Sequence, residues 1–281
     1  MILSEAWKIY EQAKTVDGYA DSTMEAYTLQ IRLLIEFVGD IEADLVNVEM
    51  LRNYVGTLGK LKPASRDHRI RFMHSFFRFL FDEEYINRDP SRKIKEKGMQ
   101  TRVPKALNID QLENLREHCV SSRERSLLEM FFATGARLAE LANIKISQLD
   151  WDRRTVTVLG KGNKEREVFW GAKADYYIRK YIGERSDGLD ALFITQRKPY
   201  RAMSKHALYG EIKRIAKRAG IDKIVWPHVL RHTLATVLLN NGADLATVQS
   251  VLGHSKPETT MIYATVSGAR RKQLFDRYFP Q

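Results

Sequence analysis

The sequence has almost no cysteine and no long apolar run. Cys119 is its single cysteine, so no disulfide can form within the chain, and a zinc site built from several cysteines is excluded. No stretch approaches the roughly 20 apolar residues of a membrane span. The N-terminus lacks the basic and apolar regions of a signal peptide. These absences predict a soluble cytoplasmic protein with no membrane partner.

Acidic residues are also in deficit. The 281 residues include 46 Lys and Arg against 35 Asp and Glu, a formal net charge of +11, while 44% hydrophobic residues match an ordinary globular protein. Residues 1–99 carry a net charge of −1, and residues 100–281 carry +12. A basic surface of this kind favours a nucleic acid as partner.

The shift in charge near residue 100 predicts two domains. We expect a helical domain at 1–95, a charged linker at 96–105 that contains Pro104, and a second domain at 106–281. In the first, apolar spacing predicts helices over about 22–38, capped by Asp21 and Ser22, and over 65–85.

The second domain combines helices with one hairpin. Residues 154–159 and 166–170 are rich in β-branched and apolar residues and flank a Gly-rich turn, and 192–194 is a candidate third strand. Further helices are expected over 110–119 and 126–134. The predicted fold class is mainly α with a small antiparallel β-sheet.

Two segments near the middle of the chain carry residues suited to phosphate chemistry. Arg137 follows Gly135 at an expected helix start, where its guanidinium can face a phosphate while Glu140 holds it. A surface salt bridge would explain the same pair. Lys161 lies on the turn of the hairpin, either as a proton donor or as an ordinary solvated charge.

Two later segments add a base, a cation and a phenol. Pro227 suits the first position of a helix, which places His228 and Arg231 on one helix face. His254 and Tyr263 follow. A tyrosine in such a place is often half-buried packing, and it becomes a nucleophile only beside cations that lower the pKa of its phenol.

Order and spacing connect these segments. Intervals of 24, 67, 3, 23 and 9 residues separate the members of one set, which are Arg137, Lys161, His228, Arg231, His254 and Tyr263. They lie in the elements Thr-Gly-x-Arg-x-x-Glu-Leu, Gly-Lys-Gly-x-Lys-x-Arg, His-x-Leu-Arg-His, Leu-Gly-His and Thr-Thr-x-x-Tyr. Over 104–281 this pattern resembles the catalytic domain of the tyrosine recombinases, the phage integrase superfamily.

The resemblance is weaker over 1–95, where it indicates the family's helical core-binding (SAM-like) domain. Helical patterning that begins near residue 4 favours the compact Xer-type or the transposon- and plasmid-resolvase arrangement. Members often carry Arg where His74 stands and Asn-Pro where Asp89-Pro90 stands. These differences concern base contacts and leave the chemistry unchanged.

The resemblance implies that DNA is cut and rejoined through a 3′-phosphotyrosine formed by Tyr263. Arg137 and Arg231 would bind the phosphate oxygens, Lys161 would protonate the departing 5′-oxygen, and His228 and His254 would assist. Glu140 would orient His228 or Arg137. The cations supply the charge that a metal would supply, so neither a metal nor a cofactor is expected.

Other basic residues fit a double-stranded DNA partner with a specific site. A locally basic stretch of the first domain and one helix of the second supply the candidates, which are Arg66, Arg69, Arg71, Lys213, Arg214, Lys217 and Arg218. A solvated helix face is the ordinary alternative. The family pattern implies a homotetramer on two sites, or a heterotetramer with a paired homologue, assembled through the last helix at the nucleoid.

Two other functions remain open at this point. A type IB topoisomerase uses a similar residue set and would relax supercoiled DNA without a defined site, although a dedicated N-terminal helical domain argues against it. A catalytically silent DNA-binding protein is the other, and the intact residue set opposes it.

Overall fold

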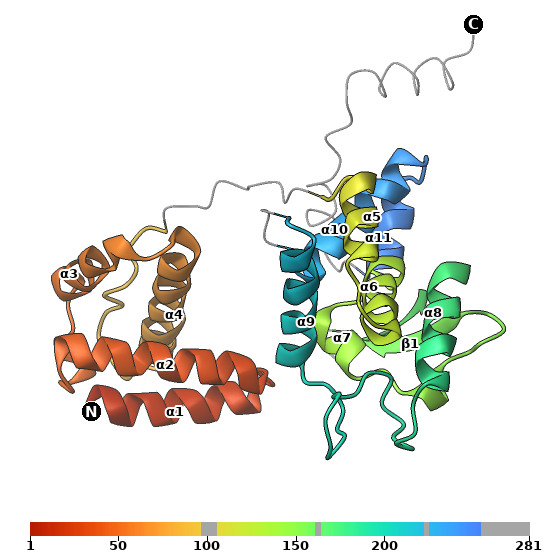
Figure 1. Ribbon diagram of the computed structural model, residues 1–281. Coiled ribbons are helices and arrows are strands. Elements are labelled where there is room, and N and C mark those ends of the chain that lie inside the picture. Colours follow the sequence, from red (N-terminus) through yellow and green to blue (C-terminus); the bar gives the residue numbers. More distant parts are fainter. Residues whose placement is uncertain (97–105, 161–163, 222–224, 254–281) are drawn as a thin grey trace, which may run out of the picture. The chain divides into compact units, whose positions relative to one another are not determined.

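The computed structural model describes residues 1–96, 106–160, 164–221 and 225–253. The chain divides into two compact units, Met1–Arg102 and Val103–Gln281, each visible in Figure 1. The division falls inside the segment predicted as a linker, while the function of each unit stays a prediction. Among the described residues, none of the helices has both the length and the apolar character needed to cross a membrane.

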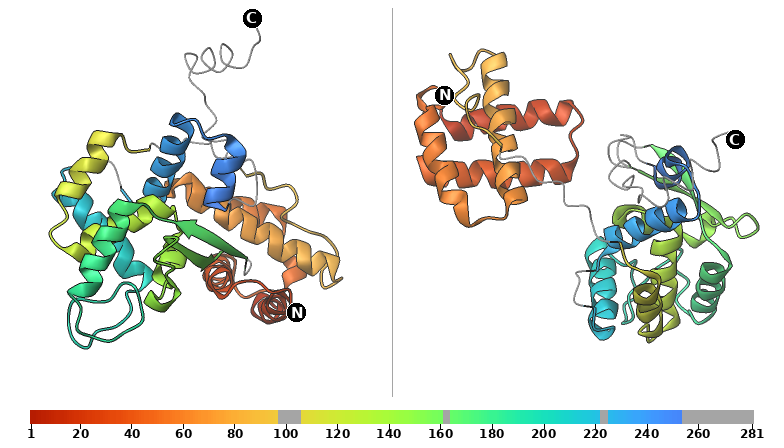
Figure 2. Two further views of the ribbon diagram at one scale, coloured as in Figure 1. Left: turned by 90° about the vertical axis from the view of Figure 1, so that its right-hand side faces the viewer. Right: turned by 90° about the horizontal axis from the view of Figure 1, so that it is seen from above.

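The first unit is built from helices. Those described are α1 (Leu3–Val16), α2 (Asp21–Val38), η1 (Ala43–Leu45), α3 (Val48–Thr57), η2 (Leu58–Lys60) and α4 (Pro63–Asp82). Helices α1 and α2 lie side by side, and α4 packs against both (Figures 1 and 2). Helix α2 begins at Asp21 after Ala20, with no side-chain cap, so the predicted cap at Asp21 and Ser22 was wrong. The Asp21 carboxylate instead lies in the first turn, where the helix dipole favours it.

Helix α4 carries the core of this unit. It starts at Pro63, whose fixed φ suits the first helical position. Phe76 and Phe77 are fully buried, and Phe76 stacks against Phe72. Phe81 is 45% exposed, whereas Phe72 and Phe76 complete the stripe that meets α1.

His74 of α4 binds the chain that follows the helix. Its ring nitrogens lie 3.2 Å from the Ser91 hydroxyl and 3.0 Å from the Ile94 carbonyl oxygen. The Asp89 carboxylate in turn accepts hydrogen bonds from the backbone and hydroxyl of Ser91. The two positions at which the sequence departs from the family pattern therefore hold one local structure.

The second unit surrounds a buried central helix, α6. Its described elements are α5 (Ile109–Glu117), α6 (Ser122–Thr134), α7 (Leu138–Ala142), η3 (Ile146–Gln148), β1 (Thr155–Leu159), β2 (Glu165–Phe169), α8 (Ala172–Gly183), α9 (Lys205–Arg218), α10 (Pro227–Asn240) and α11 (Leu245–Leu252). Helices α8, α9 and α10 pack against α6, whose Leu127, Met130 and Phe131 have no exposed surface.

The sheet of this unit is a two-stranded antiparallel hairpin. Thr155 pairs with Phe169 and Leu159 with Glu165, and the valines of the hairpin face the core. The candidate third strand at 192–194 was wrong, because Ile194 forms only an isolated bridge with Ala202. The segment is buried in the core, and its backbone groups bond to connecting segments instead of to a strand. The mainly helical fold with a small antiparallel sheet is confirmed.

Candidate active site

Arg137 is positioned by a sharp turn between two helices. Helix α6 ends at Gly135, which has a left-handed φ of +56°. A Cβ there would lie 2.8 Å from methyl carbons of Leu234 and Leu252, so any larger residue would force these leucines to shift, and the left-handed backbone also favours glycine. The Thr134 hydroxyl accepts a hydrogen bond from the Ala136 backbone. The turn makes Arg137 the N-cap of α7.

Glu140 is the buried centre of the site. Its side chain is 2% exposed. Oε1 accepts from Arg137 Nη1 at 2.7 Å, and Oε2 accepts from both the Arg137 backbone N–H and Arg166 Nη2, each at 2.7 Å. Burial raises the pKa of Glu140, but the hydrogen bonds from Arg137 and the charge of Arg166 outweigh it, so the pKa lies below its usual value. Because Glu140 is buried, the Arg137–Glu140 pair is not an ordinary surface salt bridge.

Helix α10 supplies His228 and Arg231. Pro227 occupies its first position, as predicted. Arg231 is 5% exposed, and its Nη1 donates to the Gly135 carbonyl oxygen at 2.6 Å. His228 is exposed. Partial desolvation and the charges of Arg231 and Arg137 lower the pKa of His228, which keeps the imidazole neutral at pH 7 and able to accept a proton.

Three guanidinium groups converge on the end of α11. The carbonyl oxygens of Val251, Leu252 and Gly253 are consecutive, and a helix leaves such terminal carbonyls unpaired. Arg166 Nη1 donates to Val251 at 2.9 Å, Arg231 Nη2 donates to Leu252, and Arg137 Nη2 donates to Gly253 at 2.9 Å. The negative end of the helix dipole thus holds three cations together.

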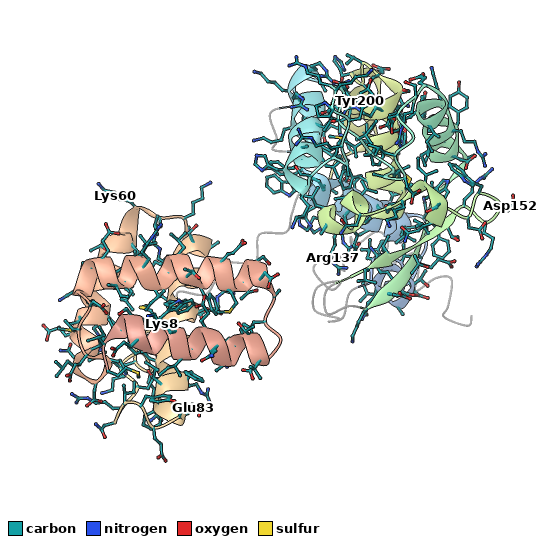
Figure 3. The ribbon with its side chains drawn as sticks, turned by 90° about the horizontal axis from the view of Figure 1, so that it is seen from below. Lys8, Lys60, Glu83, Arg137, Asp152 and Tyr200 are labelled. Carbon is teal, nitrogen blue, oxygen red and sulfur yellow. The ribbon has the colours of Figure 1, made fainter. Side chains whose placement is uncertain are left out.

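The hairpin turn begins at the same place. A Cβ at Gly160 would lie 3.4 Å from Glu140 Oε1 and 3.6 Å from Arg137 Nη1. In Figure 3, Arg137 lies at the edge of the second unit, well apart from Tyr200. Lys161, His254 and Tyr263 lie outside the described residues. Gly160 and Gly253, the residues before Lys161 and His254, are both at this cluster.

Arg166 is the member of the cluster that the sequence analysis did not single out. It lies on β2, its side chain is 12% exposed, and burial lowers its pKa. It is the last residue of the Gly-Lys-Gly-x-Lys-x-Arg element, and its place in that element is the feature of the sequence that could have identified it. Spacing alone could not show that a strand would deliver it to Glu140.

The arginines predicted to contact DNA in the first unit lie along α4. Arg71 is exposed, while Arg66 and Arg69 are half-buried. Arg69 Nη1 donates to the Tyr54 hydroxyl at 3.2 Å. Arg71 Nε donates to the Asp67 carbonyl oxygen at 3.3 Å. Their contact with DNA stays a prediction.

The basic stripe of the second unit lies on α9, where four cations are exposed: Lys213, Arg214, Lys217 and Arg218. Both arginines already have acidic partners. Arg214 pairs with the buried Glu211, and Arg218 pairs with the buried Glu124 and donates to the His118 carbonyl oxygen. The stripe therefore has a weaker positive field than its sequence indicates.

The described residues offer no metal site. No group of three or more His, Cys, Asp or Glu among them could hold an ion. The expectation that the reaction needs no metal rests on the predicted set of cations and stays a prediction.

Known proteins resemble both the sequence and the fold. Residues 105–270 match the model of the phage integrase family. Tyrosine recombinase XerD of Oceanobacillus iheyensis is 34% identical, over 94% of this chain and 94% of that protein. Tyrosine recombinase XerC of Leptospira interrogans is 28% identical, over 98% of this chain and 93% of that protein.

A solved structure shows the same fold. It is a lambda integrase dimer bound to a COC′ core site, with a TM-score of 0.79, 17% identity, and coverage of 92% of this chain and 97% of that one. The family match covers more than half of the chain, including Arg137, Arg231 and Tyr263. The chain therefore belongs to the phage integrase family, the tyrosine recombinases.

Proposed function

We propose that this tyrosine recombinase cuts and rejoins double-stranded DNA at a specific site through a 3′-phosphotyrosine at Tyr263. The observation that carries the proposal is the cluster around Glu140, in which Arg137 and Arg231 donate to neighbouring carbonyls of α11. Two guanidinium groups fixed this close to each other suit one phosphate with two non-bridging oxygens.

The two arginines overcome the charge of the phosphodiester. A phosphodiester anion repels a nucleophile, and its pentacoordinate transition state carries still more negative charge on the non-bridging oxygens. Arg137 and Arg231 neutralise that charge with groups that are already in place. The phosphotyrosyl bond keeps the energy of the bond that was broken, so rejoining needs no ATP.

Proton transfer falls to the remaining members of the set. His228, with its lowered pKa, accepts the proton of the Tyr263 hydroxyl as it attacks. Lys161, next to Gly160, donates a proton to the departing 5′-oxygen. His254, next to Gly253, donates a hydrogen bond to the phosphate.

DNA binding extends beyond the reacting phosphate. Arg66, Arg69 and Arg71 on α4 contact the backbone from the first unit, and the cations of α9 contribute from the second. We propose that two occupied sites assemble into a tetramer, either of this chain alone or with a paired homologue. It acts on DNA of the cytoplasm or nucleoid, in chromosome partition or in recombination of a mobile element.

Covalent trapping on a DNA library tests this function without a known site. The protein is incubated with nicked duplexes of random sequence, denatured with SDS, and the attached DNA is sequenced, with Tyr263→Phe as the control. We expect adducts that share one motif and that are lost in Tyr263→Phe.

Other results would favour other functions. Adducts with scattered sequences would indicate a topoisomerase. Tight, salt-sensitive binding without any adduct would indicate a silent DNA-binding protein.

A further inference from the structure

Arg166 joins three elements of the active site without belonging to the reacting set. From β2 it donates to Glu140 on α7 and to the Val251 carbonyl oxygen on α11, at 2.7 and 2.9 Å. Its side chain is nearly buried. Removing a guanidinium from water costs free energy, and the contacts with Glu140 and Val251 must offset this desolvation penalty.

The charge of Arg166 changes what Arg137 can do. Glu140 carries one negative charge, and Arg137 alone would neutralise it in a one-to-one pair. With Arg166 on the same carboxylate, the three groups carry a net charge of +1. The Arg137 guanidinium therefore keeps an attraction for an incoming phosphate that a closed ion pair would lose.

Arg166 also packs against Gly253, whose carbonyl oxygen is the second acceptor that holds the Arg137 side chain, after Glu140. Gly253 has a left-handed φ of +63°, and a Cβ there would lie 2.3 Å from Arg166 Cδ and 2.8 Å from its Nε. The Arg166 side chain thus lies directly against the Gly253 backbone. The Gly253 carbonyl oxygen accepts from Arg137 Nη2, so both anchors of Arg137 contact Arg166.

We propose that Arg166 is a positioning residue that holds Arg137 ready for the phosphate, by sharing the Glu140 carboxylate and by fixing the end of α11. This rests on the proposed function, because it assigns Arg137 to the reacting phosphate. Arg166 itself acts only through Glu140 and the backbone of α11.

Three variants separate charge from shape. Arg166→Gln removes the charge and keeps hydrogen-bond donors, while Arg166→Lys keeps the charge. Arg179→Gln is the matched control, because Arg179 lies on the surface of α8, where it pairs with Asp175. Each glutamine variant removes one positive charge from a DNA-binding protein, so a loss of nonspecific affinity is common to both.

The first measurement uses the protein without DNA. Amide hydrogen exchange of Arg137 reports its bond to Glu140 Oε2, and exchange over 251–253 reports the end of α11. We expect Arg166→Gln to exchange faster at both places and Arg179→Gln to match the wild type. Unchanged protection in Arg166→Gln would overturn the positioning role, whether or not the protein cuts DNA.

The second measurement is the rate of Tyr263 adduct formation on two DNAs of the trapped sequence. One has the normal scissile phosphate, and the other has a neutral methylphosphonate there. On the normal DNA, Arg166→Gln should be about 30-fold slower than the wild type, by analogy with the roughly 10- to 100-fold losses that follow removal of residues that orient metal ligands. Arg166→Lys should recover most of this rate.

The neutral DNA separates positioning from general damage. It needs less positive charge at Arg137, so Arg166→Gln should approach the wild-type rate on it. Equal slowing on both DNAs would show a merely structural role and overturn the proposal, as would a normal rate of Arg166→Gln on the phosphate DNA. If the wild type forms no adduct at all, the proposed function fails, and the exchange measurement still decides the role of Arg166.

Discussion

Glu140 shows how one buried carboxylate can organise several cations. Its two oxygens receive three hydrogen bonds, from the side chain and backbone of Arg137 and from Arg166. Replacement by glutamine removes the charge and leaves two guanidinium groups without their anion. The site therefore depends on Glu140 for stability as well as for the geometry of Arg137.

We expect Glu140→Gln to lower the free energy of unfolding by about 3–5 kcal/mol, as when one partner of a buried ion pair is removed. Chemical denaturation at neutral pH measures this. The matched control is Glu167→Gln, since Glu167 pairs with the exposed Arg153 on the surface. This substitution should lower the free energy of unfolding by less than about 0.5 kcal/mol. Equal costs for the two variants would contradict the central place of Glu140.

His232 gives the second unit a dependence on pH. Burial lowers its pKa to about 4, and the charges of His228 and Arg231 add to this. The unfolded chain, with a histidine pKa of about 6.5, binds the proton more readily. The stability that neutral His232 contributes is thus complete above that pH and is lost progressively as the pH falls toward about 4.

Between pH 7.5 and pH 5, His232 should account for a loss of about 2 kcal/mol in the free energy of unfolding. In His232→Gln, which cannot titrate, this part of the pH dependence should be missing. Denaturation curves of both proteins at the two pH values give the comparison. The same loss in both proteins would show that His232 keeps an ordinary pKa when folded.

At the scale of elements, the turn at Gly135 places both arginines. It starts α7 at Arg137, and its own carbonyl oxygen accepts from Arg231. Gly135 is confined by its left-handed backbone and by the methyl groups of Leu234 and Leu252. Gly220 has nearly the same φ, +62°, but a Cβ there would meet nothing within 4 Å.

Alanine substitutions at Gly135 and Gly220 distinguish the cost of overpacking from the cost of backbone strain. Gly220→Ala should cost only the strain of a left-handed alanine, about 1 kcal/mol. Gly135→Ala should cost about 2–4 kcal/mol, because overpacking is added to that strain. Thermal unfolding of both variants tests the difference. Equal shifts in Tm would mean that Leu234 and Leu252 move aside without cost.

Elements with a clear local signal could be predicted from the sequence. Pro227 marks the start of α10, and the β-branched runs around the Gly-rich turn mark the hairpin. The segment at 192–194 misled because an apolar, fully buried stretch has the composition of a strand whether or not a partner strand exists. Pairing depends on tertiary structure, which a local pattern does not contain.

The site was predictable where a residue type and its place in a motif carry chemistry. Arg137, Glu140, His228 and Arg231 belong to such motifs. The structure brings Arg137, Glu140 and Arg231 together around the end of α11, and His228 senses the charges of Arg231 and Arg137. The role of Arg166 and the engagement of Arg218 with the buried Glu124 depend on contacts between residues 26 and 94 positions apart. Even the short Arg214–Glu211 pair needs the burial of Glu211, which only packing provides.

At the scale of the whole molecule, the proposed tetramer depends on contacts between protomers on two DNA sites. The stretch 270–281 has Leu274, Phe275, Tyr278 and Phe279 at helical spacing, and it lies outside the described residues. If it docks on a neighbouring protomer, its deletion should abolish assembly on paired sites while binding to a single site survives. Gel-shift and recombination assays measure both. Unchanged recombination would contradict this role.

The covalent intermediate tests the central claim most directly. Trypsin cleavage after Arg231 and Arg270 would release residues 232–270, in which Tyr263 is the single tyrosine. DNA trapped with the protein is digested, and the peptide is sequenced by mass spectrometry. We predict a nucleotide joined through its 3′-phosphate to Tyr263, with a free 5′-hydroxyl on the other DNA end. A nucleotide on another residue, or joined through a 5′-phosphate, would contradict the account.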